Sequence, residues 1–373
     1  MAASVLVTGA SGFIGCHIVR ELLGRGTRVR ALVRPSSDTR GLDGLDVELV
    51  QGDVLEGGGL REAMSGCDLV FHAAAVYAYG GHEPTAIEDV AVRGTLHVID
   101  AARDAGVERV VLTGSSVIFG SSTGTRPRDE TALGDGVEQV PYFQAKLRQD
   151  AMAFERGAAA GLEILSACPT IVVGPLDHRP TPSNGAILQY LNDPTRSTFD
   201  GGCNVVAVQD VARGHVLVAE RGTPGERYLL GSENWPWTLF HRTTSELCGI
   251  PGPWAMASHA TAYVAATAWE AWARIARGGP YYNRTQARTV GRFYWYDARK
   301  AAALGYAPRP ARDAMAEAIA WLLRTPLVSN RLRRQLTLSD DVHFAWARIR
   351  AGVEGTAAGR PEPGAPSGRG REA

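Results

Sequence analysis

Tyr142 and Lys146 form the residue pair with the clearest chemical meaning; they lie in the run PYFQAK (residues 141–146). Side chains at positions i and i+4 share one face of a helix, so the phenol and the ammonium would be neighbours. A phenol with an ordinary pKa of about 10 is a poor acid or base at neutral pH. A nearby ammonium favours the phenolate and lowers that pKa. The pair therefore predicts proton transfer, although this spacing also occurs on ordinary amphipathic helices.

Three glycines near the start of the chain predict a phosphate-binding turn, in the run TGASGFIG (residues 8–15). Glycine is needed where the backbone turns sharply, where it approaches a pyrophosphate, and where the helix packs on the strand. The N-terminus of the following helix offers free N–H groups and a positive dipole end. A tight strand-to-helix turn would also use glycines, but this context favours dinucleotide binding. The expected cofactor-binding residues here are Gly9, Ser11, Gly12, Phe13, Ile14 and Gly15.

The end of the second predicted strand, in the run LVRPSS (residues 32–37), indicates which dinucleotide binds. Enzymes that use NAD place an Asp or Glu at this point, where it binds the 2′-hydroxyl of the ribose. Arg34 stands there instead, with Ser36 and Ser37 beside it. A guanidinium pairs with a 2′-phosphate and gains little from a bare hydroxyl. The run therefore predicts NADP(H); a solvated surface arginine is the alternative.

Around these motifs, short apolar runs alternate with helix-like segments through the first 170 residues or so. Runs that are apolar nearly throughout are typical of strands buried on both faces of a parallel sheet. We expect strands at residues 4–7, 28–33, 47–50, 69–72, 109–113 and 163–167, and helices at 13–23, 83–105 and 143–160. This alternation predicts an α/β fold of the Rossmann type, a doubly wound parallel sheet with right-handed crossovers.

The later part of the chain predicts a smaller α+β C-terminal lobe that binds substrate. We expect a loop at 174–184, a helix at 186–191, a strand at 205–208, a helix at 211–220, and an Ala- and Trp-rich helix at 257–277. The expected division is 1–175 for the NADP(H)-binding domain, to which later strands return, and 176–325 mainly for the substrate lobe. A helical extension would cover 326–351, and the Gly-, Pro- and Arg-rich tail 352–373 is expected to be disordered.

Composition narrows the possible partners. The 39 basic and 39 acidic residues cancel, which argues against nucleic acid or an anionic membrane as a partner. The five cysteines are widely spaced and form neither a metal-ligand pattern nor a disulfide framework. We see no signal peptide and no apolar run long enough to span a bilayer. These features predict a cytoplasmic protein without a metal, whose partners are a small-molecule substrate and, as an option, a second copy of the chain.

The G-x-x-G-x-x-G spacing resembles the extended branch of the short-chain dehydrogenase/reductase superfamily, the NAD-dependent epimerase/dehydratase superfamily. Further motifs in the same order strengthen the resemblance: GDV (residues 52–54), HAAA (72–75) and CPTIVVGP (168–175). The last of these is similar to the segment that lines the nicotinamide in dihydroflavonol-4-reductase-like enzymes. Runs at 177–184, 225–231 and 304–310 are similar to those of hopanoid-associated sugar epimerases. The likeness covers about residues 4–325.

The resemblance implies roles for individual residues. It makes Ser115 the hydroxyl that binds the substrate oxygen, with Ser116 as the fallback, and it lets Lys146 hold the nicotinamide ribose. It also implies that Asp53 contacts the adenine. The remaining implied cofactor contacts are Val54, Ala73, Ala74, Ala75, Tyr142, Pro169, Thr170 and Ile171. His178 and Asn184, just beyond the nicotinamide segment, are candidate substrate contacts. One departure is Ala91, where the family usually has Asn, so that a buried hydrogen bond is missing or replaced.

These features favour an NADP(H)-dependent reductase of a ketone or aldehyde on a small apolar molecule, with Ser115, Tyr142 and Lys146 as its catalytic groups. The main alternative is a nucleotide-sugar epimerase, which generally retains NAD; Arg34 argues against it. A sugar dehydratase is disfavoured because no acidic pair follows Ser115. A non-catalytic NADP(H)-sensing protein is the alternative from another class.

Overall fold

The fold is built on a parallel sheet of seven strands in the order β10-β6-β5-β4-β1-β2-β3. The computed structural model describes residues 4–76, 84–122, 126–258, 260–261, 264, 266–268, 287 and 289–357. The strands are β1 (Ser4–Thr8), β2 (Arg28–Val33), β3 (Glu48–Gln51), β4 (Cys67–His72), β5 (Arg109–Thr113), β6 (Glu163–Pro169) and β10 (Arg227–Leu230). The six predicted strands and the doubly wound architecture are confirmed, and the order reverses between β1 and β4.

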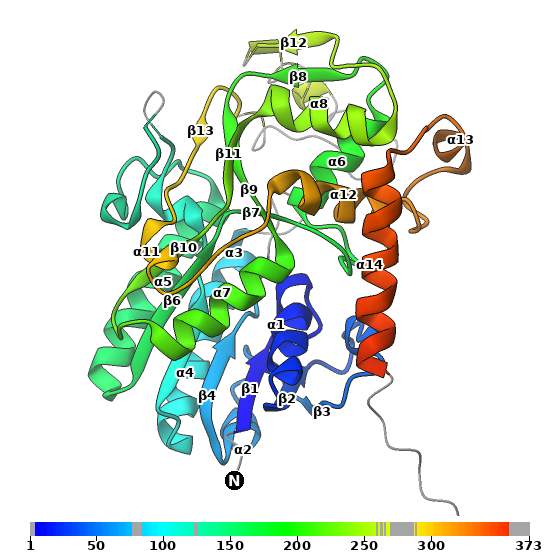
Figure 1. Cartoon of the computed structure of the whole chain (residues 1–373). Coiled ribbons are helices and arrows are strands. Elements are labelled where there is room, and N and C mark those ends of the chain that lie inside the picture. Colours follow the sequence, from blue (N-terminus) through cyan, green and yellow to red (C-terminus); the bar gives the residue numbers. More distant parts are fainter. Residues whose placement is uncertain are drawn as a thin grey trace, which may run out of the picture.

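Helices cover both faces of this sheet, as the apolar strands require (Figure 1). One face carries α1 (Phe13–Gly24) and α7 (Val208–Arg221); the other carries α2 (Leu60–Met64), α4 (Gly94–Ala105) and α5 (Pro141–Ala160). Side chains along β1 alternate between the two cores, with Val5 and Val7 on the α1 face and Leu6 on the α4 face. The helices predicted at 13–23 and 143–160 correspond to α1 and α5, and their observed ends differ by at most two residues.

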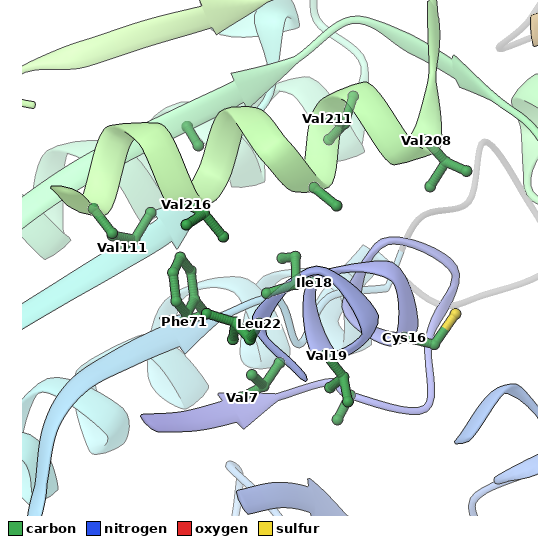
Figure 2. Packing of buried hydrophobic residues seen from close by; sticks show 14 of the residues in the cluster. Val7, Cys16, Ile18, Val19, Leu22, Phe71, Val111, Val208, Val211 and Val216 are labelled. Atoms are coloured by element: carbon green, nitrogen blue, oxygen red, sulfur yellow. The ribbon is translucent and has the colours of Figure 1, made fainter. Parts of the chain in front are cut away.

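The packing of α1 against α7 holds the glycine loop to the sheet. Figure 2 shows Ile18 and Leu22 on the side of α1 that faces α7, with Phe71 of β4 between Leu22 and Val216 of α7; Val211 of α7 belongs to the same buried cluster. All five side chains are buried. Burying a large aliphatic side chain contributes about 1.5–3 kcal/mol. The start of α1, where phosphate would bind, is thus anchored by a core that begins within two turns of it.

The predicted helix at 83–105 is present from residue 84, with a change of pitch inside it. It consists of α3 (Pro84–Glu88), a π-helical turn (Asp89–Arg93) and α4. Ala91, the departure from the family pattern, lies buried at the centre of the π-helical turn. Such single π-helical turns inside α-helices are frequent at functional sites.

The second lobe lies above the carboxyl ends of the sheet strands (Figure 1). One small sheet contains β7 (Ile171–Val173), β9 (Gly202–Ala207), β11 (Glu233–Pro236) and β13 (Phe293–Tyr294), and a second pairs β8 (Ser197–Phe199) with β12 (Ala255–Ala257). The helices with it are α6 (Pro182–Asn192), α8 (Trp237–Cys248), α11 (Arg299–Ala302), α12 (Ala311–Leu322), α13 (Asn330–Arg333) and α14 (Asp340–Ala357). α12 packs on β9, α8 and α14 around one apolar core.

Two predicted boundaries need correction. The loop expected at 174–184 ends early, because Thr181 precedes Pro182 at the first position of α6. Residues 208–230 form α7, which covers the main sheet, and β10, which returns to that sheet as expected for later strands. α14 continues to Ala357, past the predicted start of the tail at 352. Most of the helix predicted at 257–277, and residues 358–373, lie outside the described residues. Within the described part of the chain, no helix has the length and apolar character to cross a bilayer.

Candidate active site

A cavity of about 410 Å³ opens at the carboxyl ends of β1, β4, β5 and β6. This is the edge of an open α/β sheet at which ligands bind, beside the point where the strand order reverses. Residues from both lobes line it. From the glycine loop and the start of α1, from the ends of β5 and β6 and the turns after β4, β5 and β6, and from β7 they are Gly12, Phe13, Ile14, Gly15, Ala73, Ala75, Val76, Thr113, Gly114, Ser115, Ser116, Val117, Pro169, Thr170, Ile171 and Val172, and from α5 they are Tyr142, Phe143 and Lys146.

The glycine loop approaches the turn after β4 so closely that side chains are excluded. Gly9 has a φ of +65°, and a Cβ there would lie 2.6 Å from backbone atoms of Ala73 and Ala74. A Cβ at Gly15 would lie 2.1 Å from the carbonyl oxygen of Gly9. The bare backbone and the N-terminus of the twelve-residue helix α1 fit the pyrophosphate of a dinucleotide.

The three predicted catalytic side chains meet at this cavity. Tyr142 and Lys146 project from the first turns of α5, which begins with Pro141 at a position where a proline is tolerated. Ser115 has extended backbone directly after β5, and a 3₁₀ turn (Ser116–Phe119) follows it. The Ser115, Tyr142 and Lys146 residues are 7%, 7% and 3% exposed. A substrate carbonyl in the cavity can therefore reach a hydroxyl, a phenol and an ammonium that are largely shielded from water.

The Lys146 ammonium is buried and held by two acceptors. Its Nζ donates to the carbonyl oxygen of Thr113 at 2.9 Å and to Oε1 of Gln149 at 2.8 Å. Burial lowers the pKa of Lys146 to about 8, and the neighbouring Cys168 and Asp150 oppose that shift. At neutral pH the side chain is still mainly protonated, as a group that stabilises a phenolate must be.

A chain of buried polar groups continues from Gln149. Its Nε2 donates to Oγ1 of Thr95 at 2.8 Å, and Thr95 donates to the Ala91 carbonyl at 2.6 Å. His72 lies between Thr95 and Thr8, at 2.9 and 2.7 Å. Burial, and secondarily the charge of Lys146, lowers the pKa of His72 to about 3, so its ring is neutral. Position 91 has only a methyl group, and the carboxamide in this network belongs to Gln149.

The other predicted cofactor residues lie beyond the cavity lining. Arg34 is exposed at the end of β2, and its backbone N–H donates to the Ser37 hydroxyl at 3.1 Å. Within the described residues its guanidinium has neither an ion pair nor a hydrogen bond. The Asp53 carboxylate accepts from the Leu55 N–H at 2.9 Å. Gly9, Ser11, Ser36, Val54 and Ala74 also lie outside the lining.

Two predicted substrate contacts do not line the cavity. The Asn184 carboxamide is fully buried; its Nδ2 donates to the Gly174 carbonyl and to Asp177, both at 3.0 Å. The His178 ring packs edge-on against Trp321, with 5.1 Å between centroids. The hydrogen bonds of the Asn184 carboxamide are thus made inside the protein, and the substrate contacts of Asn184 and His178 stay predictions. The other predicted substrate contact, Ser116, lines the cavity.

The remaining lining residues were not among the predicted site residues. They are Arg179, Pro180, Thr181, Ser183, Asn204, Trp237, Thr289, Tyr294 and Tyr296. The first four lie in the run at 177–184 that carries part of the family resemblance. The aromatic residues are Trp237 of α8, Tyr294 of β13 and Tyr296 just after β13, and they follow no recognisable spacing. Burial raises the pKa of Tyr294 and Tyr296, so both phenols stay protonated. In the described ranges, no group of three or more His, Cys, Asp or Glu side chains could hold a metal ion.

Comparisons with known proteins agree with this geometry. A sequence model of the NAD dependent epimerase/dehydratase family matches residues 5–231. A Synechocystis sp. protein provisionally named dihydroflavonol 4-reductase is 36% identical over 68% of this chain and 75% of its own. Sterol demethylase protein B of Methylococcus capsulatus is 31% identical over 85% and 98%. Among solved structures, a nucleoside-diphosphate-sugar epimerase from Pseudomonas aeruginosa is 27% identical, with a TM-score of 0.71 over 88% of this chain and 100% of that one.

Proposed function

This chain belongs to the NAD-dependent epimerase/dehydratase family, and on that premise we propose that it is an NADP(H)-dependent reductase of ketones or aldehydes. The observation that carries the proposal is the meeting of Ser115, Tyr142 and Lys146 in one cavity that also reaches the glycine loop. The relative named as a reductase supports reduction as the direction. The protein would then convert the carbonyl group of a small apolar molecule to an alcohol.

Each side chain has a distinct part in this reaction. A reduced nicotinamide, when bound, supplies a hydride. The Ser115 hydroxyl donates a hydrogen bond to the carbonyl oxygen of the substrate, and Tyr142 transfers its proton to that oxygen as negative charge develops. The Lys146 ammonium, one turn along α5, stabilises the phenolate that remains. Because the site is largely closed to water, these interactions act in a low effective dielectric.

The apolar character of the substrate is supported by the walls of the cavity. Val76, Val117 and Phe143 come from the sheet side, and Trp237 comes from the second lobe. No carboxylate lines the cavity among the described residues, and one exposed cation, Arg179, lies on its rim. Such a lining favours a mainly apolar body with a few polar substituents.

The preference for NADP(H) is supported by Arg34. A guanidinium that pairs with a 2′-phosphate contributes about 1.5–3 kcal/mol, or roughly ten- to hundredfold in affinity. We expect NADPH to bind at least about tenfold more tightly than NADH, and Arg34→Ala to abolish that ratio. Arg28→Ala is the matched control, because Arg28 is an exposed arginine at the opposite end of the same strand. Fluorescence titration of both cofactors measures the ratio, and equal affinities in the wild type would refute the preference.

Isotope transfer separates reduction from epimerisation, the alternative that the Pseudomonas aeruginosa structure favours. Purified protein is incubated with NADPH carrying deuterium at C4 and with a panel of carbonyl compounds. A reductase must release oxidised cofactor each cycle, so deuterium should appear in the alcohol with matching loss of NADPH. An epimerase returns the hydride to its own substrate. NAD retained through purification, with no label in any product, would establish the alternative.

A further inference from the structure

We propose that Gln149 is a positioning residue of this site, whose carboxamide fixes the Lys146 ammonium and stabilises its charged form. The inference rests on the role proposed above for Lys146. Gln149 is 1% exposed and lies three residues after Lys146 on α5. It does not line the cavity, so any effect on the reaction must pass through Lys146.

The hydrogen bonds around Gln149 determine which way its carboxamide points. Thr95 has one hydroxyl proton, which goes to the Ala91 carbonyl, so its oxygen can only accept from its other two neighbours. Those neighbours are Nε2 of Gln149 and Nε2 of His72. The amide nitrogen must therefore face Thr95, and the amide oxygen must face Lys146.

The same reasoning fixes the far end of the network. His72 donates from Nε2 to Thr95, so its neutral ring accepts at Nδ1 from the Thr8 hydroxyl. The Thr8 oxygen in turn is 3.4 Å from the backbone N–H of Ala74. Every proton in the chain has one assignment, which leaves Gln149 no second orientation of similar energy.

Fixing Gln149 also directs Lys146. An ammonium has three donors, and two of them are engaged by Thr113 and Gln149. The third is left for the cavity that Lys146 lines, where the cofactor and Tyr142 would be. The carbonyl oxygens of Thr113 and Gln149 thus replace water as partners of a buried charge.

Other titratable groups near Lys146 stabilise its charged form less than Gln149 does. The titratable groups around it are Asp150 and Tyr142 of α5, Cys168 of β6 and His72 of β4. Asp150 is the one carboxylate among them, and it forms an ion pair with Arg227 at 2.7 Å. Burial raises the pKa of the Cys168 thiol to about 12, and His72 is neutral. The hydrogen bond that Oε1 of Gln149 accepts from the ammonium is therefore the main side-chain support for the charged form.

The composition of the chain makes a direct test possible. The sequence contains two lysines, Lys146 and Lys300. Lysine labelled with ¹³C at the ε carbon gives two side-chain signals, and Lys300→Arg assigns them. Titration of the cofactor-free protein then reads the charge of Lys146 without any substrate. In the wild type we expect its midpoint near pH 8.

Two substitutions at position 149 should move that midpoint in opposite directions. Gln149→Leu removes an acceptor of the ammonium, which should weaken proton binding at Lys146 about tenfold and lower the midpoint by about one pH unit. Gln149→Glu places an anion beside the ammonium and should raise the midpoint. The pH above which NADPH affinity falls should shift in the same directions. Gln144→Leu is the matched control on α5, because among the described residues the Gln144 side chain bonds only the Glu138 carbonyl.

A purely structural role gives a different result. It would change the unfolding midpoint of both variants and leave the Lys146 titration where it was; that outcome, or shifts in the same direction, would overturn the proposal. If Gln149→Leu does not fold, the Lys146 titration midpoint of Gln149→Glu still tests the proposal, because an unchanged or lowered midpoint there would overturn it. If Lys146 titrates as described but no carbonyl is reduced, the reductase proposal fails and the role of Gln149 stands.

Discussion

Replacing Gly9 by alanine should destabilise the protein more than its backbone angle alone explains. The φ of +65° places an L-residue in the left-handed region, which costs about 1–2 kcal/mol. The added Cβ would also lie 2.6 Å from the backbone of Ala73 and Ala74, where no flexible side chain can move away. Overpacking of this kind costs about 1–3 kcal/mol. We expect Gly9→Ala to lower the free energy of unfolding by about 2–5 kcal/mol.

Gly26→Ala separates the two contributions. Gly26 has a φ of +75°, and a Cβ there would meet no atom within 4 Å. It should therefore show the cost of the angle alone, about 1–2 kcal/mol. Urea denaturation of both variants gives the difference, and titration with NADPH should show weaker binding only in Gly9→Ala, because the displaced Ala73 lines the cavity. Equal losses of stability would show that the close approach of the loop to Ala73 is not rigid, and the argument for a preformed phosphate site would fail.

Three further substitutions test the site and its support. Tyr142→Phe removes only the phenolic oxygen and proton; NADPH affinity should hold while turnover falls about 10²–10⁴-fold, and steady-state rates near the wild type would contradict the assigned role. Ile18→Ala empties the contact between α1 and α7, so urea denaturation should show a loss of about 2–5 kcal/mol; a loss well below that range would mean that the helices repack. Asn184→Leu should lower stability by about 1–3 kcal/mol and leave the KM of an accepted carbonyl compound unchanged, whereas the reverse pattern would return Asn184 to the substrate site.

The sequence was sufficient to predict the main sheet and the residues at its strand ends that line the cavity. Strands buried on both faces are apolar throughout, and β2 and β5 coincide with the predicted ranges. The carboxyl ends of parallel strands meet at one edge, so short motifs that follow successive strands must converge. Ser115, Ala73 and Pro169, each placed after a different strand, line the same cavity.

The substrate side could not be predicted in the same way. Asn204 and Tyr294 reach the cavity because β9 and β13 pair in the second lobe, and that pairing joins segments about ninety residues apart. No local spacing encodes such a contact. Asn184 illustrates another difficulty: a polar side chain next to a known motif suggests ligand binding, but Asn184 lies outside the cavity lining and bonds to Gly174 and Asp177 inside the protein. A polar residue is evidence for a ligand only when its partners are known.

The network behind Lys146 shows how the parallel topology supplies what a motif lacks. Thr8 ends β1 and His72 ends β4, and these strands are neighbours with Thr8 opposite His72. That pairing places His72 between Thr8 and Thr95 of α4, and α4 packs against α5, which carries Gln149. One short run of hydrogen bonds therefore connects the turn that carries Ala74 with Lys146. The members of this network are separated by up to 141 residues, from Thr8 to Gln149. The sequence alone therefore showed that Ala91 lacks the carboxamide usual in the family. That Gln149 supplies a carboxamide to the network could be found only in the fold.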